Sequence, residues 1–162
     1  MTFDRDINSK VLLREEKKLK LPSADITSFI EVGKIAMKLG IDRKLPIAVQ
    51  VRIGDWIIFH ASLPGSNSKN QWWIDRKARV VLLKHHSTLY ERVLAEERGV
   101  DWHKENNLLD ETHAIHGGGL PLITKKDGFV GVLLISGLPQ VDDHLLGVEV
   151  LTEFLARKGE LL

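Results

Sequence analysis

The most distinctive run of the chain is a histidine followed by three glycines, His116-Gly117-Gly118-Gly119. Glycine has no Cβ and tolerates positive φ, so successive backbone N–H groups in such a run can converge into a concave nest. A nest of this kind binds carboxylate or phosphate, and His116 could add a hydrogen-bond donor or a metal ligand. The structural alternative is a tight turn that lets a strand pass close to a helix. α/β-Hydrolases use a similar run, but they need a Gly-x-Ser-x-Gly elbow, which this sequence lacks.

A second candidate is Asp142-Asp143-His144, which precedes a stretch with helical apolar spacing. We interpret Asp142 as the N-cap of this helix and both carboxylates as favoured by its dipole. A charged imidazole is disfavoured at that end of a helix, so His144 should be neutral near pH 7 and able to ligate a metal or accept a proton. If the preceding turn lies beside the glycine run, His144 and His116 could share one pocket.

Cations and aromatic side chains are mixed at Arg76 and Lys77, which follow Trp72 and Trp73. Nucleic-acid sites use this mixture, because cations hold phosphates and aromatic rings stack on bases. It also suits an amphipathic helix with one solvated side, an oligomer contact, or the rim of a ligand pocket. Ser87 has no partners that would mark a nucleophile, and we expect it to line a pocket or cap a helix.

Two further histidine patterns give little support for a metal site. His113 and His116 are separated by two residues, which permits joint binding on a turn, but no third ligand is assured. His85-His86 follows a helical stretch, where a histidine is favoured by the helix dipole and a surface role is expected. We therefore predict no metal site.

Composition restricts the function further. The 162 residues include no cysteine, which excludes disulfides, thiolate metal sites, iron–sulfur clusters and CxxCH haem attachment. The formal net charge is +1, from 23 basic and 22 acidic residues, and this balance argues against nucleic acid or an anionic membrane as a partner. No apolar run approaches the roughly 20 residues of a spanning helix, and the N-terminus shows no secretory apolar stretch. We expect a cytoplasmic protein.

Charge is nevertheless distributed unevenly along the chain. The segment 67–85 carries five basic residues against Asp75, and the segment 91–111 carries seven acidic residues against three basic ones. Two patches of opposite sign could meet within the fold or between subunits.

Hydrophobic periodicity predicts helices interspersed with two hairpins. The expected fold class is α+β, with an antiparallel sheet covered by helices, in one domain of residues 1–162 with an N-terminal helix in 1–20 and a core in 20–160. Ser23 is expected to cap the second helix and Gly40 to end it, while the box Thr88–Glu91 should open a helix that ends at Gly99. The expected helices span 6–20, 26–39, 68–85, 88–98 and 142–155, and the expected strands span 46–53, 56–61, 120–124 and 129–136.

Four segments, taken in order, carry a family resemblance. They are Trp73-Ile74-Asp75-Arg76-Lys77 with Val80-Val81, then His86-Ser87-Thr88-Leu89, then His116-Gly117-Gly118-Gly119-Leu120-Pro121-Leu122, and finally Gly131-Val132, Ile135-Ser136-Gly137-Leu138 and Asp142-Asp143-His144. Over about residues 20–160 the chain resembles the HbpS/GlcG-like haem-degrading domain family, especially its short bacterial and fungal proteins of uncharacterised function. The resemblance implies a profilin-like fold with a five-stranded antiparallel sheet, a high-order homo-oligomer, and a link to haem or related small ligands.

The leading functional hypothesis is binding of a small anionic or haem-like ligand in a homo-oligomer, with oxidative haem breakdown as the reaction to test. The alternative is a non-enzymatic oligomeric adaptor or assembly protein. Haem is the cofactor that the resemblance implies. The expected ligand-binding residues are His116, Gly117, Gly118, Gly119, His144, Arg76, Lys77 and Ser87, with a Lys or Arg holding a carboxylate by a charge-assisted hydrogen bond.

Overall fold

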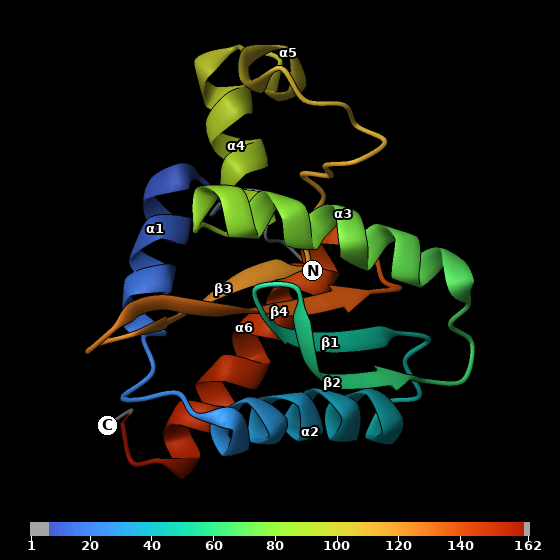
Figure 1. Cartoon of the computed structure of the whole chain (residues 1–162), viewed down its shortest axis with the longest axis vertical. Helices are drawn as coiled ribbons and strands as arrows, with labels where there is room; N and C mark the ends of the chain where they lie inside the picture. The colour runs from blue at the N-terminus through green and yellow to red at the C-terminus, as the bar shows by residue number, and fades with distance from the viewer. Residues whose placement is uncertain (1–6, 161–162) are drawn as a thin grey trace.

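The structure is a computed structural model that describes residues 7–160. Six helices and four strands follow one another in the order expected for helices interspersed with two hairpins (Figure 1). The helices are α1 (Ser9–Lys18), α2 (Ile26–Asp42), α3 (Ser68–Lys84), α4 (Thr88–Arg98), α5 (Trp102–Asn106) and α6 (Gln140–Arg157), and the strands are β1 (Ala48–Ile53), β2 (Trp56–Ser62), β3 (Gly119–Thr124) and β4 (Gly128–Ser136). None of the helices between residues 7 and 160 is long and apolar enough to cross a membrane.

The sheet is antiparallel throughout, with strand order β2-β1-β4-β3. The two hairpins β1–β2 and β3–β4 therefore meet through their strands β1 and β4, where Ala48 pairs with Ser136 and Arg52 with Val132. This confirms the predicted α+β class with an antiparallel sheet. The turn of the second hairpin lies at Lys126-Asp127-Gly128, where Gly128 has φ +75° and supplies the left-handed conformation that the turn needs.

Helices cover both faces of this sheet, α2 and α6 on one and α3 on the other (Figure 1). Alternate residues of β4 divide between the two layers: Leu133 and Ile135 pack with α2 and α6, whereas Val132 and Leu134 pack under α3. Because successive side chains of a strand point to opposite faces, a strand covered on both sides must be apolar throughout. That explains the nearly continuous apolar sequence of β4.

Four strands are present among residues 7–160, one fewer than the family resemblance implied. A single residue occupies the position beside β3: Leu21 forms an isolated parallel bridge with Thr124. Its N–H donates to Ile123 O at 2.7 Å, and its carbonyl accepts from Lys125 N at 2.9 Å. The pairing does not extend beyond this single bridge.

Three predicted helix N-caps were wrong. Asp25, not Ser23, caps α2, and its carboxylate accepts from Ser28 N at 2.7 Å. The helix α4 spans Thr88–Arg98 as expected, but Ser87, which we expected to line a pocket or cap a helix, is its N-cap in place of Thr88. Asp142 does not cap α6, which begins at Gln140 after Pro139, so both aspartates lie within its first turn. In that turn a carboxylate still interacts favourably with the helix dipole.

Three other features of the structure differ from the predictions. Gly40 does not stop α2 but lies buried inside it, and a Cβ there would collide with Leu63 and come within 3.0 Å of Ile47. The glycine therefore allows close approach of α2 to the sheet. The short helix α5 in the segment 101–109 was not predicted, because its five residues are too few to show a period. The strand expected at 120–124 begins one residue earlier, because Gly119 is the first residue of β3.

Candidate functional site

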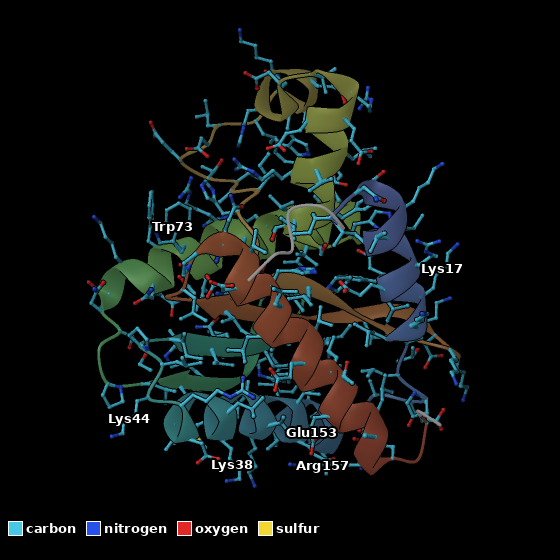
Figure 2. All side chains as sticks on the ribbon, turned by 180° about the vertical axis from the view of Figure 1, so that it is seen from behind. Lys17, Lys38, Lys44, Trp73, Glu153 and Arg157 are labelled. Carbon is cyan, nitrogen blue, oxygen red and sulfur yellow. The ribbon has the colours of Figure 1, made fainter. Side chains whose placement is uncertain are left out.

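A cavity of about 290 Å³ opens where α3, the turn after β4, the start of α6 and the loop before β3 meet. Figure 2 labels Trp73 on α3, beside this end of α6. The cavity is lined by Asn70, Trp73, Lys77, His116, Ser136, Gly137, Leu138, Gln140 and Asp143. Of the residues predicted from the sequence, the structure places Lys77 and His116 on its wall.

A buried ion pair forms one wall of the cavity. The side chains of Lys77 on α3 and Asp143 on α6 are each 3% exposed. Lys77 Nζ donates to Asp143 Oδ2 at 3.2 Å and to the carbonyl of Ile135 at 2.9 Å. Asp143 Oδ1 accepts from the backbone N–H of Leu138 at 3.0 Å. The pair therefore joins the two helices across the end of β4.

Burial shifts both partners of this pair towards their neutral forms. It raises the pKa of Asp143 to about 6, although the charge of Lys77 and two backbone N–H groups act in the opposite direction. Burial also lowers the pKa of Lys77, against the attraction of Asp143. A carboxyl group that titrates near neutral pH in a cavity is typical of functional sites. Protonation of Asp143 would leave the cavity with an uncompensated positive charge.

His116 lines the same cavity from the loop before β3 and is half-buried. Its ring makes an edge contact with Trp73, with 4.7 Å between centroids. Its buried Nδ1 has no hydrogen-bond partner among residues 7–160. Burial first, and then the charges of Arg92 and Lys77, lower its pKa. The imidazole is therefore neutral at pH 7, the form that accepts a proton or ligates a metal.

The glycine run is packed more tightly than an open nest of amides would be. Gly117 N donates to the Gln140 side chain at 3.1 Å, and Gly119 N donates to Thr88 Oγ1 at 3.1 Å. At Gly118, with φ +123°, a Cβ would collide with the carbonyl of Ile135 and lie 2.7 Å from Nζ of Lys77. The glycines thus let the loop lie directly against the buried amine, but none of the three lines the cavity.

The loop between α5 and the glycine run is fastened to α3 by Arg76. This guanidinium is 1% exposed and makes a 2.9 Å ion pair with Asp110, to whose carbonyl it also donates at 2.7 Å. It lies 4.0 Å from the ring of Trp72 and 4.5 Å from that of Trp73. Arg76 does not line the cavity, but it ties down the loop that carries His116. The basic and acidic segments of the sequence meet here within the fold.

His144 and Ser87 lie away from the cavity wall. His144 is buried in α6, and its Nε2 lies 2.8 Å from Oε1 of Glu15 on α1. The turn before α6 does adjoin the glycine run, but the His144 ring turns towards α1 and does not share the cavity with His116. Ser87 Oγ accepts from Tyr90 N at 3.1 Å and caps α4.

Sequence reasoning missed Asn70, Ser136 and Gln140 and treated Asp143 as a helix-end residue. Asn70 Nδ2 donates to Ser136 Oγ at 3.1 Å, so these two polar side chains join the ends of α3 and β4. A signal for Asp143 was present, because it precedes the buried Leu146 and Val150 at helical spacing. A carboxylate on the apolar stripe of a helix is expected to be buried.

Fold and site together define a helix-covered antiparallel α+β protein with a small ionisable pocket between its layers. The family model described as "Haem degrading protein HbpS-like" matches residues 26–152. The chain belongs to this family, which confirms the resemblance seen in the four sequence segments.

Relatives of similar length support the assignment. A UPF0303 protein of Streptomyces avermitilis is 37% identical over 143 residues, covering 88% of each chain. A UPF0303 protein of Rhizobium johnstonii is 34% identical over 162 residues, covering 100% of this chain and 98% of the relative.

Solved structures share the fold at lower sequence identity. The crystal structure of the Ybr137w protein has a TM-score of 0.82 and 24% identity, covering 93% of this chain and 89% of that one. The crystal structure of a PduOC:heme complex has a TM-score of 0.67 and 16% identity, covering 80% of this chain and 94% of that one.

Proposed function

We propose that the cavity binds a small ligand through a carboxylate group. The observation that carries this proposal is the Lys77–Asp143 pair on the cavity wall. Lys77 is a buried cation, and Asp143 loses its negative charge as the pH falls through about 6. A buried ammonium in a medium of low dielectric attracts an anion more strongly than a surface lysine does. Ser136 and Gln140 add neutral hydrogen-bonding groups to the same wall.

Haem is one ligand whose carboxylates could enter the cavity. The donor set fits, since Lys77 would hold a propionate and the neutral imidazole of His116 would serve as an iron ligand. At about 290 Å³ the cavity lies at the lower limit of ligand pockets, so it would enclose one edge of a porphyrin and leave the rest outside. Bound haem would supply an iron centre that activates oxygen. The family membership and the haem complex of PduOC favour testing this ligand.

Two titrations test the proposal. Calorimetry with lactate, a small carboxylate, should show saturable binding to the wild-type protein. Haemin titration by absorbance should give a Soret band that weakens or shifts in His116→Ala but not in His113→Ala, because His113 lies on the same loop outside the cavity. Ascorbate addition then tests oxidative breakdown, since decay of the band would indicate degradation. Absence of both lactate and haemin binding would refute the proposal.

Self-association is a second candidate function, favoured by the exposed edge of the sheet. Strand β2 lies at the end of the strand order, and it presents Trp56 and Ile57, which are 59% and 46% exposed. Edge strands offer unpaired backbone groups, and exposed apolar side chains there mark a contact surface. Light scattering should give a larger mass for the wild type than for Ile57→Lys. Ile26→Lys on α2 is the matched control, because Ile26 is also 46% exposed.

A further inference from the structure

Among the lysines of residues 7–160, Lys77 alone is buried. Its amine faces two fixed acceptors, the Ile135 carbonyl at 2.9 Å and Asp143 at 3.2 Å, and it borders the cavity. An ammonium group has three hydrogens, so these two contacts use two of them and leave the third for another acceptor. When the proton passes to Asp143, the amine has a free lone pair beside a cavity large enough for a small molecule.

We propose that Lys77 is a nucleophile that forms an imine with a short oxo acid, a ligand that bears a carbonyl beside its carboxylate. This inference rests on the proposed function, since it names the class of anion that the same cavity would take. Buried lysines next to an acid are the type that enzymes use for Schiff-base formation. The lowered pKa of Lys77 supports the same role, because it increases the free-amine fraction near neutral pH.

The surrounding groups provide for the proton transfers of this step. Asp143 takes a proton from the Lys77 ammonium, and the amine nitrogen attacks the carbonyl carbon as the C=O electron pair moves to oxygen. That oxygen takes the proton from Asp143, which gives a carbinolamine, and Asp143 accepts one proton from the nitrogen. Asp143 returns that proton to the hydroxyl group, the C–O bond breaks, and one water leaves as the C=N bond forms. No oxidant or reductant is needed.

The cavity also limits the size of the oxo acid and places its carboxylate. Its volume of about 290 Å³ suits a molecule of few heavy atoms. The Gln140 amide oxygen accepts from Gly117, which directs its amide nitrogen to a different partner, and Ser136 Oγ accepts from Asn70, which leaves its hydroxyl hydrogen for an acceptor. Both groups line the cavity and can donate to the carboxylate.

Reductive trapping tests the inference on the full-length protein. Pyruvate with cyanoborohydride at pH 7 should give one adduct per chain, and peptide mapping of the wild type should place it on Lys77. Occupancy of Lys77 should exceed that of the exposed lysines, because burial lowers the pKa of Lys77 and so increases its free-amine fraction. Lactate, which has a carboxylate but no keto group, should compete with pyruvate.

Matched variants separate this inference from simple anion binding. Lys77→Arg keeps the positive charge but cannot form an imine, so trapping should be lost, whereas Lys84→Arg should be trapped like the wild type. Adducts spread over exposed lysines, with Lys77 unmodified, would overturn the inference even where lactate binding persists and the proposed function stands. Absence of both trapping and lactate binding would overturn the two together. Mapping on the wild type gives this result whether or not Lys77→Arg folds.

Discussion

Gly118→Ala is the substitution that most directly tests how tightly the glycine run packs against β4 and Lys77. Gly118 has φ +123°, where an L-residue is strained by about 1–3 kcal/mol. The new methyl group would also collide with the Ile135 carbonyl, which belongs to the central strand β4, and would lie 2.7 Å from Nζ of Lys77. Overpacking of this kind costs a further 1–3 kcal/mol or so. We expect a loss of about 2–6 kcal/mol in the free energy of unfolding.

Gly54→Ala is the matched control for this substitution. Gly54 also has a positive φ, +58°, but a Cβ there would meet nothing within 4 Å. Its cost should be limited to the left-handed conformation, about 1–2 kcal/mol. Urea unfolding followed by circular dichroism measures both variants, and an unchanged slope would show that only stability has changed. If Gly118→Ala were no less stable than Gly54→Ala, the packing assigned to the glycine run would be wrong.

Three further predictions follow from the charged groups. Burial raises the pKa of Asp143 to about 6, so its protonation removes a negative charge from the cavity, and calorimetry should show tighter lactate binding at pH 5.5 than at pH 7.5. The protonated Asp143 also stabilises the fold: this contribution is fully present below pH 4 and is lost as the pH rises through about 6. Arg76→Met should cost about 1–3 kcal/mol and increase hydrogen exchange in residues 108–116, because the tie to Asp110 is removed; unchanged exchange would contradict this. The hydrogen bond that the His86 imidazole donates to the Glu16 carboxylate raises the pKa of His86. The stabilisation lost in Glu16→Gln should therefore be full below pH 6.5 and should shrink at higher pH in unfolding experiments; a constant loss would refute it.

Hydrophobic periodicity predicted most of the fold, because at most positions the residue type depends on whether the side chain faces the core. The apolar run 129–136 became a central strand covered on both faces, and the alternating segment 46–53 became β1. The predicted start of a helix was less accurate where two residues that can serve as its N-cap lie close together in the sequence, as Ser23 and Asp25 do before α2. Gly40 was misread because a helix interior tolerates a glycine when the neighbouring layer needs its space.

The candidate site was less predictable, because its members belong to segments far apart in the chain. The sequence favoured His116 as a pocket residue, and the structure places it on the cavity wall beside Trp73. Arg76 and Lys77 are adjacent in sequence but point to different surroundings, since residues one apart on a helix do not share a face. Only the three-dimensional packing shows that Arg76 fastens a loop and Lys77 borders the cavity.

The buried pair explains why this protein keeps a cavity at this position. Two charges in a low-dielectric interior cost more free energy than two apolar side chains of similar size would. Lys77 and Asp143 both lie on helix stripes that otherwise face the core, so apolar residues could have closed the gap between α3 and α6. The ion pair instead leaves polar groups beside a space that the packing does not fill. A stabilised but ligand-free protein is therefore the expected result of replacing both by apolar residues, and retention of lactate binding in such a double variant would show that the pair is structural alone.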